Sequence, residues 1–145
     1  MQKLKYAFMP NPKYDGIRPI SIYLMRAIYG LMFFVLGKDV WSKILFHEGA
    51  WGSKDAMVWC VWAAFSSLAL IGIFRTVRML PILLLEIFYK VLWLAIVVLP
   101  LVRSGQTISP EVTDMMQAFL WVALPIIAVP WGYVVNRYLL GRTAN

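Results

Sequence analysis

Three ionisable side chains, Arg26, Glu86 and Lys90, lie inside stretches of sequence that are otherwise almost entirely apolar. Glu86 and Lys90 are four residues apart, so in a helix they share one face and can form an ion pair. A carboxylate beside two cations can pass protons, or it can orient the cations to bind a carboxylate or phosphate. The same residues also have a purely structural explanation, because Glu86 would offset two cations whose unpaired burial is more costly.

Helix depth predicts that these residues form one polar cluster in the cytoplasmic half of a bundle. At a rise of about 1.5 Å per residue, Arg26 and Glu86 lie level with each other, roughly 10 Å from the cytoplasmic ends of their helices. We therefore expect Arg26 to approach Glu86 within hydrogen-bonding distance, with Lys90 on the same side. The further polar residues predicted for this cluster are Ser66, Ser67, Tyr133 and Asn136.

A second candidate for chemistry is the adjacent pair His47 and Glu48, between the first two apolar blocks. This pair could bind a metal ion or a proton, and the alternative is a solvated pair at the edge of a short helix. The chain has one His and one Cys, which argues against a dedicated metal site built from these ligands. We expect no metal and no cofactor, and Cys60 has no partner for an internal disulfide.

The elements that must position these residues are four apolar blocks. Hydrophobic residues make up 61% of the 145 residues and charged residues 14%, whereas soluble domains have about 45–50% and about 25%. A membrane-spanning helix needs roughly 20 mostly apolar residues. The sequence predicts one all-α transmembrane domain over residues 1–145, a polytopic bundle of four helices in the bilayer. The predicted spans are about 20–37, 56–74, 79–102 and 115–139.

The charged residues outside the blocks predict the orientation of the bundle. The net charge is +7, and the basic residues flank apolar blocks instead of gathering on a soluble face, which argues against nucleic-acid binding. Lys and Arg are enriched in the N-terminal segment, the second connection and the tail, so both termini are predicted to be cytoplasmic. The first outer loop, "KDVWSKILFHEGAWGSKD", alternates apolar and polar residues and is predicted to contain a short interfacial helix.

Two local patterns predict how the helices bend and pack. Pro125 and Pro130 interrupt the backbone hydrogen bonding of the fourth block, so we expect a kink there. Small residues follow one face of the second block and allow close approach of a neighbouring helix. These residues are Cys60, Ala63, Ala64 and Ser67.

Two stretches, "RTVRMLPILLLEIFYKVLW" and "VPWGYVVNRY", resemble a family of small bacterial four-helix integral membrane proteins that has no assigned function. The chain departs from this family at Thr76-Val77, where a Tyr-Pro pair is frequent. The resemblance implies a multi-pass protein of the bacterial inner membrane, and it implies no activity or substrate. The matching positions are Arg75, Met79, Leu80, Pro81, Leu83, Leu84, Glu86, Lys90, Trp93, Pro130, Trp131 and Tyr133.

The sequence bears on three classes of function, and the third, a membrane enzyme or quinone-linked redox component, has the least support in it. A structural or accessory membrane protein, or a subunit of a larger complex, fits the small size and the many aromatic residues at the block ends. The alternative is a small proton-coupled or anion transporter with Arg26, Glu86 and Lys90 along its path, which would have to be a homo-oligomer to enclose one. We expect no enzyme activity, because the sequence has no nucleophile–base constellation and no cofactor fingerprint.

The predicted topology can be tested by labelling single cysteines in a Cys60→Ser background. Cysteines that replace Lys3 and Gly105 should react with a membrane-impermeant maleimide from opposite sides of the membrane, because Lys3 lies in the predicted cytoplasmic segment and Gly105 in the second predicted outer loop. Labelling of both positions from the same side would contradict the four-span topology with cytoplasmic termini.

Overall fold

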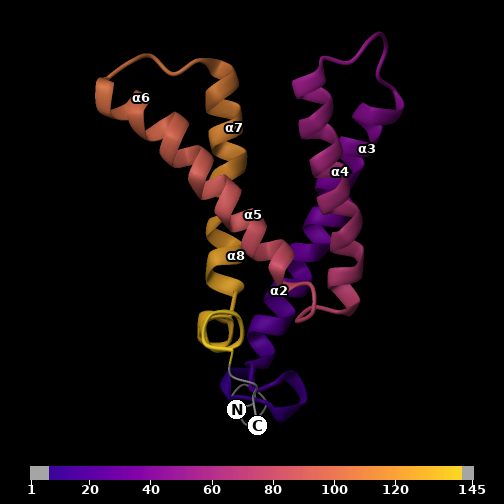
Figure 1. The fold of residues 1–145 in the computed structure, drawn as a ribbon, viewed down its shortest axis with the longest axis vertical. Helices are drawn as coiled ribbons and strands as arrows, with labels where there is room; N and C mark the ends of the chain where they lie inside the picture. The colour runs from indigo at the N-terminus through magenta and orange to yellow at the C-terminus, as the bar shows by residue number, and fades with distance from the viewer. Residues whose placement is uncertain (1–6, 142–145) are drawn as a thin grey trace.

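The computed structural model describes residues 7–141, and these residues fold into helices joined by short connections (Figure 1). The helices follow the order in which the apolar blocks occur along the chain. Their bounds are η1 Pro12–Tyr14, α2 Pro19–Leu31, η2 Met32–Leu36, α3 Gly37–Leu45, α4 Ser53–Phe74, α5 Leu80–Trp93, η3 Leu94–Val98, α6 Leu99–Ser104, α7 Pro110–Leu120, α8 Ala123–Ala128, α9 Trp131–Val134 and η4 Val135–Leu139.

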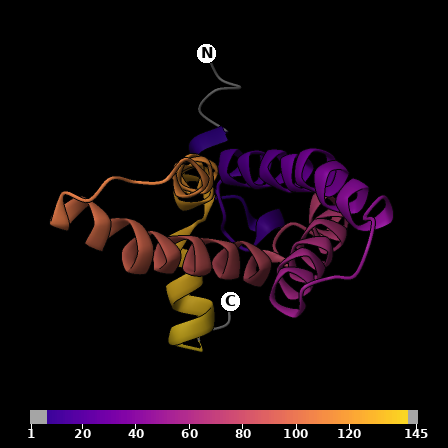
Figure 2. The same ribbon diagram turned by 90° about the horizontal axis from the view of Figure 1, so that it is seen from above.

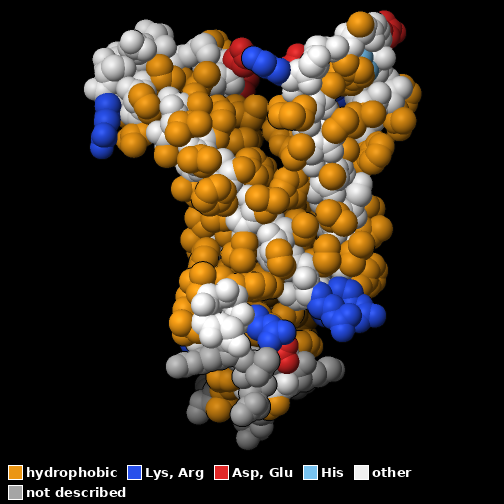
Figure 3. All heavy atoms as spheres, viewed as in Figure 1, with side chains coloured by type: hydrophobic (Ala, Val, Ile, Leu, Met, Phe, Trp, Pro, Cys, Tyr) orange, Lys and Arg blue, Asp and Glu red, His pale blue; other side chains and the backbone are white. Residues whose placement is uncertain are grey.

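Four helices are long and apolar enough to cross a membrane: Pro19–Leu45, Ser53–Phe74, Leu80–Ser104 and Pro110–Ala128. The prediction of an all-helical fold with four such helices is therefore confirmed, and it suggests a membrane protein. On the face shown in Figure 3, hydrophobic side chains cover the middle of the molecule, and the charged side chains gather toward its two ends. A belt of this kind is the surface that a bilayer requires.

The first helix is longer than its apolar block, because it continues through Gly37 to Leu45. Gly37 keeps a right-handed helical conformation, with φ −59° and ψ −46°. A Cβ atom built on Gly37 would lie 3.5 Å from the Cβ atom of Ser66, which is an ordinary van der Waals distance, so α3 packs closely on α4 at this position. The residues predicted to form a short interfacial helix in the first outer loop are helical as far as Leu45, and they continue the first helix as α3.

The fourth helix departs from the prediction of a span over residues 115–139, because it begins at Pro110 and ends at Ala128. Ser109 caps its start by accepting a hydrogen bond from the backbone of Val112. The predicted kink at Pro125 is confirmed: α7 ends at Leu120 and α8 starts at Ala123. The cause is that a proline ring clashes with the carbonyl four residues before it.

At Pro130 the chain turns instead of kinking. Val129 is extended, with ψ 127°, as is usual for a residue before proline. Since Pro130 has no N–H for the carbonyl of Ile126, the indole N–H of Trp131 donates to that carbonyl at 2.8 Å. The segment Trp131–Leu139 then runs across the bundle: Figure 1 shows it end-on and Figure 2 from the side. The sequence predicted that this segment continues the fourth span, and the structure shows that it does not.

The helices form two arms that meet at one end of the molecule (Figure 1). One arm contains α3 and α4, and the other contains α5, α6 and α7. Helix α2 packs against both α4 and α8 where the arms meet. The apolar core lies at this junction, and its most deeply buried side chains include Ile22, Met25 and Tyr29 of α2 and Leu80 and Leu83 of α5.

The ring of Tyr29 is the central contact of this core. It is fully buried, and its hydroxyl donates to the backbone carbonyl of Thr76 at 3.4 Å. A Cβ atom built on Gly72 would lie 2.5 Å from the ring, so α4 can approach Tyr29 only with a glycine at this position. The junction of α2, α4 and the connection to α5 therefore depends on the ring of Tyr29 and on the absence of a Cβ atom at Gly72.

We expect Gly72→Ala to lower the free energy of unfolding by about 1–3 kcal/mol, because the new methyl group overpacks the Tyr29 ring. The matched control is Gly30→Ala in α2, where a Cβ atom meets nothing within 4 Å. That variant should be neutral or more stable by about 0.5–1 kcal/mol, since alanine favours helix. Unfolding in detergent measures both, and an equal effect of the two changes would contradict the packing.

Candidate functional site

The predicted ion pair between Glu86 and Lys90 is present in the structure. The ammonium of Lys90 donates to Glu86 Oε1 at 2.7 Å, and the side chains of Lys90 and Glu86 are 14% and 7% exposed. Both residues lie on α5, where their spacing of four residues brings them onto one face. Lys90 also lies over the ring of Phe119 in α7, with 5.8 Å between its nitrogen and the ring centroid.

The predicted pairing of Arg26 with Glu86 is wrong. Arg26 instead donates from Nε to the hydroxyl of Thr76 at 3.1 Å, in the connection between α4 and α5. Among residues 7–141 the one ion pair is that of Glu86 with Lys90. A matching depth along two helices does not specify how each helix is rotated about its axis, and the buried face of α2, with Met25 and Tyr29, determines the direction of Arg26.

The two serines predicted for the cluster do not reach Glu86 either. The hydroxyls of Ser66 and Ser67 both donate to the carbonyl of Ala63, at 3.0 Å and 2.8 Å. Serine in the middle of a helix commonly bonds to a carbonyl one turn earlier, which satisfies its hydroxyl without a partner helix. Ser66 is buried where α3 crosses α4, so its role is packing against Gly37.

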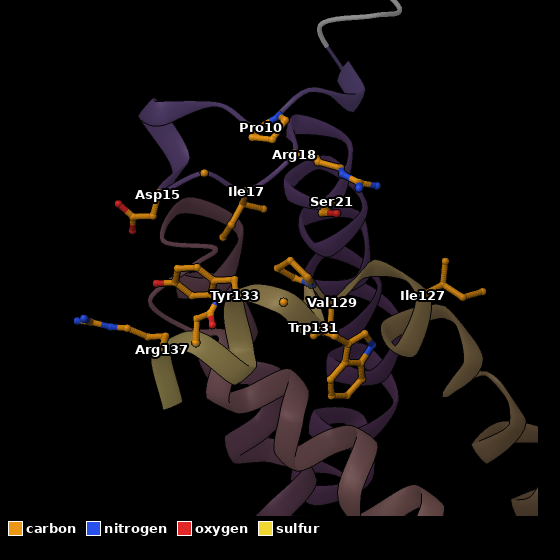
Figure 4. A pocket seen from close by; sticks show the side chains of 14 residues that line it. Pro10, Asp15, Ile17, Arg18, Ser21, Ile127, Val129, Trp131, Tyr133 and Arg137 are labelled. Atoms are coloured by element: carbon orange, nitrogen blue, oxygen red, sulfur yellow. The ribbon is translucent and has the colours of Figure 1, made fainter. Parts of the chain in front are cut away.

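Tyr133 and Asn136 lie in a different place, because the chain turns at Pro130. They line a cavity of about 890 Å³ together with Asp15, Arg18 and Arg137 (Figure 4). Burial raises the pKa of Tyr133, and the nearby Asp15 carboxylate adds to this shift. The side chains of Arg18 and Arg137 point away from each other (Figure 4), so the two cations do not converge on one ligand position.

Glu86 and Lys90 border a groove between the two arms. The groove has a volume of about 510 Å³, and its walls come from α2 and η2, α4, α5, α7 and α8. Most of its surface is apolar, and the other charged group among its described lining residues is Asp39 of α3. The lining side chains include Met32, Trp62, Tyr89, Phe119, Trp121 and Leu124.

The carboxylate of Glu86 is only half satisfied. Its Oε1 atom bonds to Lys90, whereas Oε2 is buried and has no hydrogen-bond partner among residues 7–141. The whole residue is 5% exposed. Buried polar atoms in proteins are nearly always hydrogen-bonded, so Glu86 is an exception among the buried polar side chains.

Aromatic rings hold the wall of the groove around Lys90. The Phe119 ring lies 4.9 Å from that of Trp93 and 5.6 Å from that of Tyr89, measured between centroids, in edge-to-face arrangements. Tyr89 also contacts Phe65 of α4. The rings therefore join α4, α5 and α7 at the level of the ion pair.

The sequence interpretation missed Thr76, Asp39 and Phe119. Thr76 lies in the connection "RTVR" between the second and third blocks, and nothing in the sequence indicates that the first helix with Arg26 packs against this connection. The sequence predicts Asp39 in an outer loop, because the first apolar block ends at Gly37. No local signal distinguishes Phe119 from the many other aromatic residues of the chain.

His47 lies in the connection between α3 and α4, where its ring stacks on that of Trp51 at 3.5 Å. Its Nε2 atom is buried without a partner among the described residues. Within residues 7–141 no group of three or more His, Cys, Asp or Glu side chains could hold a metal ion. The contact with Trp51 thus explains the position of the His47 ring.

We expect Lys90→Met to lower the free energy of unfolding by about 3–5 kcal/mol, because it leaves the carboxylate of Glu86 buried without a counter-charge. The double change Glu86→Leu with Lys90→Met should recover most of this loss, since no charge then remains. The control Lys38→Met changes an exposed lysine and should stay within about 0.5 kcal/mol. Equal destabilisation by the single and the double change, in detergent unfolding, would contradict the pairing.

Comparison with known proteins gives no relative for this arrangement of helices and groove. No family model, no curated protein and no solved structure matches the chain. The resemblance of its third and fourth blocks to four-helix bacterial membrane proteins therefore stays a prediction, and the function has to be argued from the geometry of the groove.

Proposed function

We propose that this chain is an integral membrane protein that acts by binding another component of the membrane, as an accessory protein or as a subunit of a larger assembly. The observation that carries the proposal is the groove between the two arms, which is mostly apolar and has the ion pair of Glu86 with Lys90 on its wall. Its volume of about 510 Å³ is typical of sites that hold a further molecule.

The separation of the two arms supports the same proposal. The share of each candidate span that is buried within the chain ranges from 17% to 33%. Apolar side chains such as Leu31 and Trp121 are more than half exposed, and both line the groove. Arms that diverge in this way leave space for a component that enters from within the bilayer.

Transport is the alternative that the intramembrane charges suggested. The transport hypothesis needs Arg26, Glu86 and Lys90 along one path. In the structure, Arg26 contacts Thr76 instead. The remaining pair is internally neutral, because the carboxylate and the ammonium are in direct contact. This arrangement favours binding of an uncharged group over passage of an ion.

We further propose, from the sequence, that the protein lies in a bacterial inner membrane with both termini in the cytoplasm.

A photocrosslinker in the groove tests the proposed binding function. A benzophenone side chain in place of Leu31, which lines the groove, should capture one discrete species when native membranes are irradiated. The matched control is the same group in place of Phe34, which is 67% exposed and lies outside the groove lining. There we expect only a mixture of bulk-lipid adducts.

The masses of the two crosslinked proteins provide the measurement. A single added mass at position 31, absent at position 34, supports a bound component. The same mixture of adducts at both positions would contradict it, because the groove would then hold only the lipids that surround every exposed face.

A further inference from the structure

The segment Trp131–Leu139, formed by α9 and η4, carries an exposed apolar stripe. Trp131, Val135, Tyr138 and Leu139 follow the spacing that places residues on one face of a helix. These four residues are 40% to 75% exposed. A contiguous row of exposed apolar side chains, unlike a single one, marks a surface that contacts a protein or a membrane.

The opposite face of this segment is polar. Tyr133, Asn136 and Arg137 line the cavity of about 890 Å³, which Asp15 and Arg18 of the N-terminal region also line. Asn136 and Arg137 are exposed. The segment is therefore amphipathic, with an apolar stripe on one face and hydrogen-bonding groups on the other.

The apolar stripe begins on the side of the segment that faces along the spans. The Trp131 indole donates to the carbonyl of Ile126 in α8, and in Figure 4 its ring points away from Asp15 and Ile17. Tyr133 lies on the side of Asp15 in the same view. The segment itself runs across the bundle, at the end where the arms meet (Figures 1 and 2). An amphipathic helix with this orientation can lie in the plane of a membrane surface, with its apolar face against the acyl chains.

The charge at this end of the molecule fits an anionic leaflet. Arg18, Arg75, Arg78 and Arg137 are exposed here, and among the described residues Asp15 is the one acidic side chain that accompanies them. Arg18 and Arg137 point away from each other (Figure 4), so each guanidinium can reach the phosphate of a different lipid. At the opposite end, acidic residues offset the basic ones. These acidic residues are Asp39, Glu48, Asp55, Glu111 and Asp114.

We propose that the segment Trp131–Leu139 is an interfacial anchor that binds an anionic phospholipid leaflet. Its apolar stripe lies against the acyl chains, and Arg18 and Arg137 bind lipid phosphates on either side of it. The rings of Trp131 and Tyr138 favour this boundary, because they are apolar and carry a polar group. The groove between the arms has no part in this anchor, so the inference stands or fails independently of the proposed binding function.

Spin labels on single cysteines test where each face of the segment lies. In a Cys60→Ser background, cysteines replace Val135 and Leu139 on the stripe and Asn136 on the polar face, in protein reconstituted into bilayers that contain phosphatidylglycerol. Oxygen, which dissolves among acyl chains, should relax the labels at 135 and 139 more than a water-soluble nickel complex does, and the order should reverse at 136. A label at Phe34, a 67% exposed residue of the first span, provides the lipid reference.

Three results of the labelling would overturn the inference. Stronger relaxation by nickel at all three positions would place the stripe in water. Stronger relaxation by oxygen at all three would place the whole segment among the acyl chains. Weak relaxation of the stripe by both reagents would mean that protein, such as a second copy of the chain, covers it.

Replacement of the two flanking arginines tests the preference for anionic lipid. Protein extracted from an equal mixture of phosphatidylglycerol and phosphatidylcholine should retain more phosphatidylglycerol, counted as bound lipids by native mass spectrometry. We expect Arg18→Gln with Arg137→Gln to reduce this preference by a factor of about five or more, because each cation near an anionic surface contributes roughly that factor. The control Arg103→Gln changes an exposed arginine at the opposite end and should leave the preference unchanged. The absence of a preference in the wild-type protein, or an equal effect of the control, would overturn the inference.

Discussion

The contact between Tyr29 and the end of α4 is the constraint on which the rest of the structure depends. The Tyr29 ring packs against Gly72, and its hydroxyl donates to the carbonyl of Thr76. Arg26, three residues earlier on α2, donates to the Thr76 hydroxyl. These contacts determine both the position and the rotation of α2 against the connection between α4 and α5. The arms diverge away from this junction, and the groove with Glu86 lies between them.

The distribution of the three intramembrane charges follows from the cost of moving charge out of water. Glu86 and Lys90 meet within one helix, so their pairing needs no alignment of separate helices. Arg26 is partly buried near the end of its helix, where a neutral hydroxyl partner satisfies one of its donors. A triad that placed all three charges together would have left one positive charge in the apolar layer. The observed arrangement leaves a neutral ion pair on the wall of the groove.

The ends of the helices show how glycine and proline act differently in an apolar chain. Gly37 stays helical and lies against Ser66 where α3 packs on α4. Pro130 ends a helix, because it removes a backbone donor and forces Val129 into an extended conformation. The indole of Trp131 compensates for the missing donor, and the last segment then lies across the bundle. Both residues occur inside long apolar stretches, so composition alone does not distinguish a continuing helix from a broken one.

The sequence by itself determined the four membrane-length helices and the ion pair of Glu86 with Lys90, since bilayer thickness and helix periodicity are local constraints. It also indicated the kink at Pro125, which has a local steric cause. Only the tertiary structure decided that Arg26 contacts Thr76, and that Tyr133 lies away from Glu86. The physical reason is that hydropathy specifies how deep a residue lies along its helix but not how that helix is rotated against its neighbours. That rotation comes from packing between side chains that are far apart in the sequence.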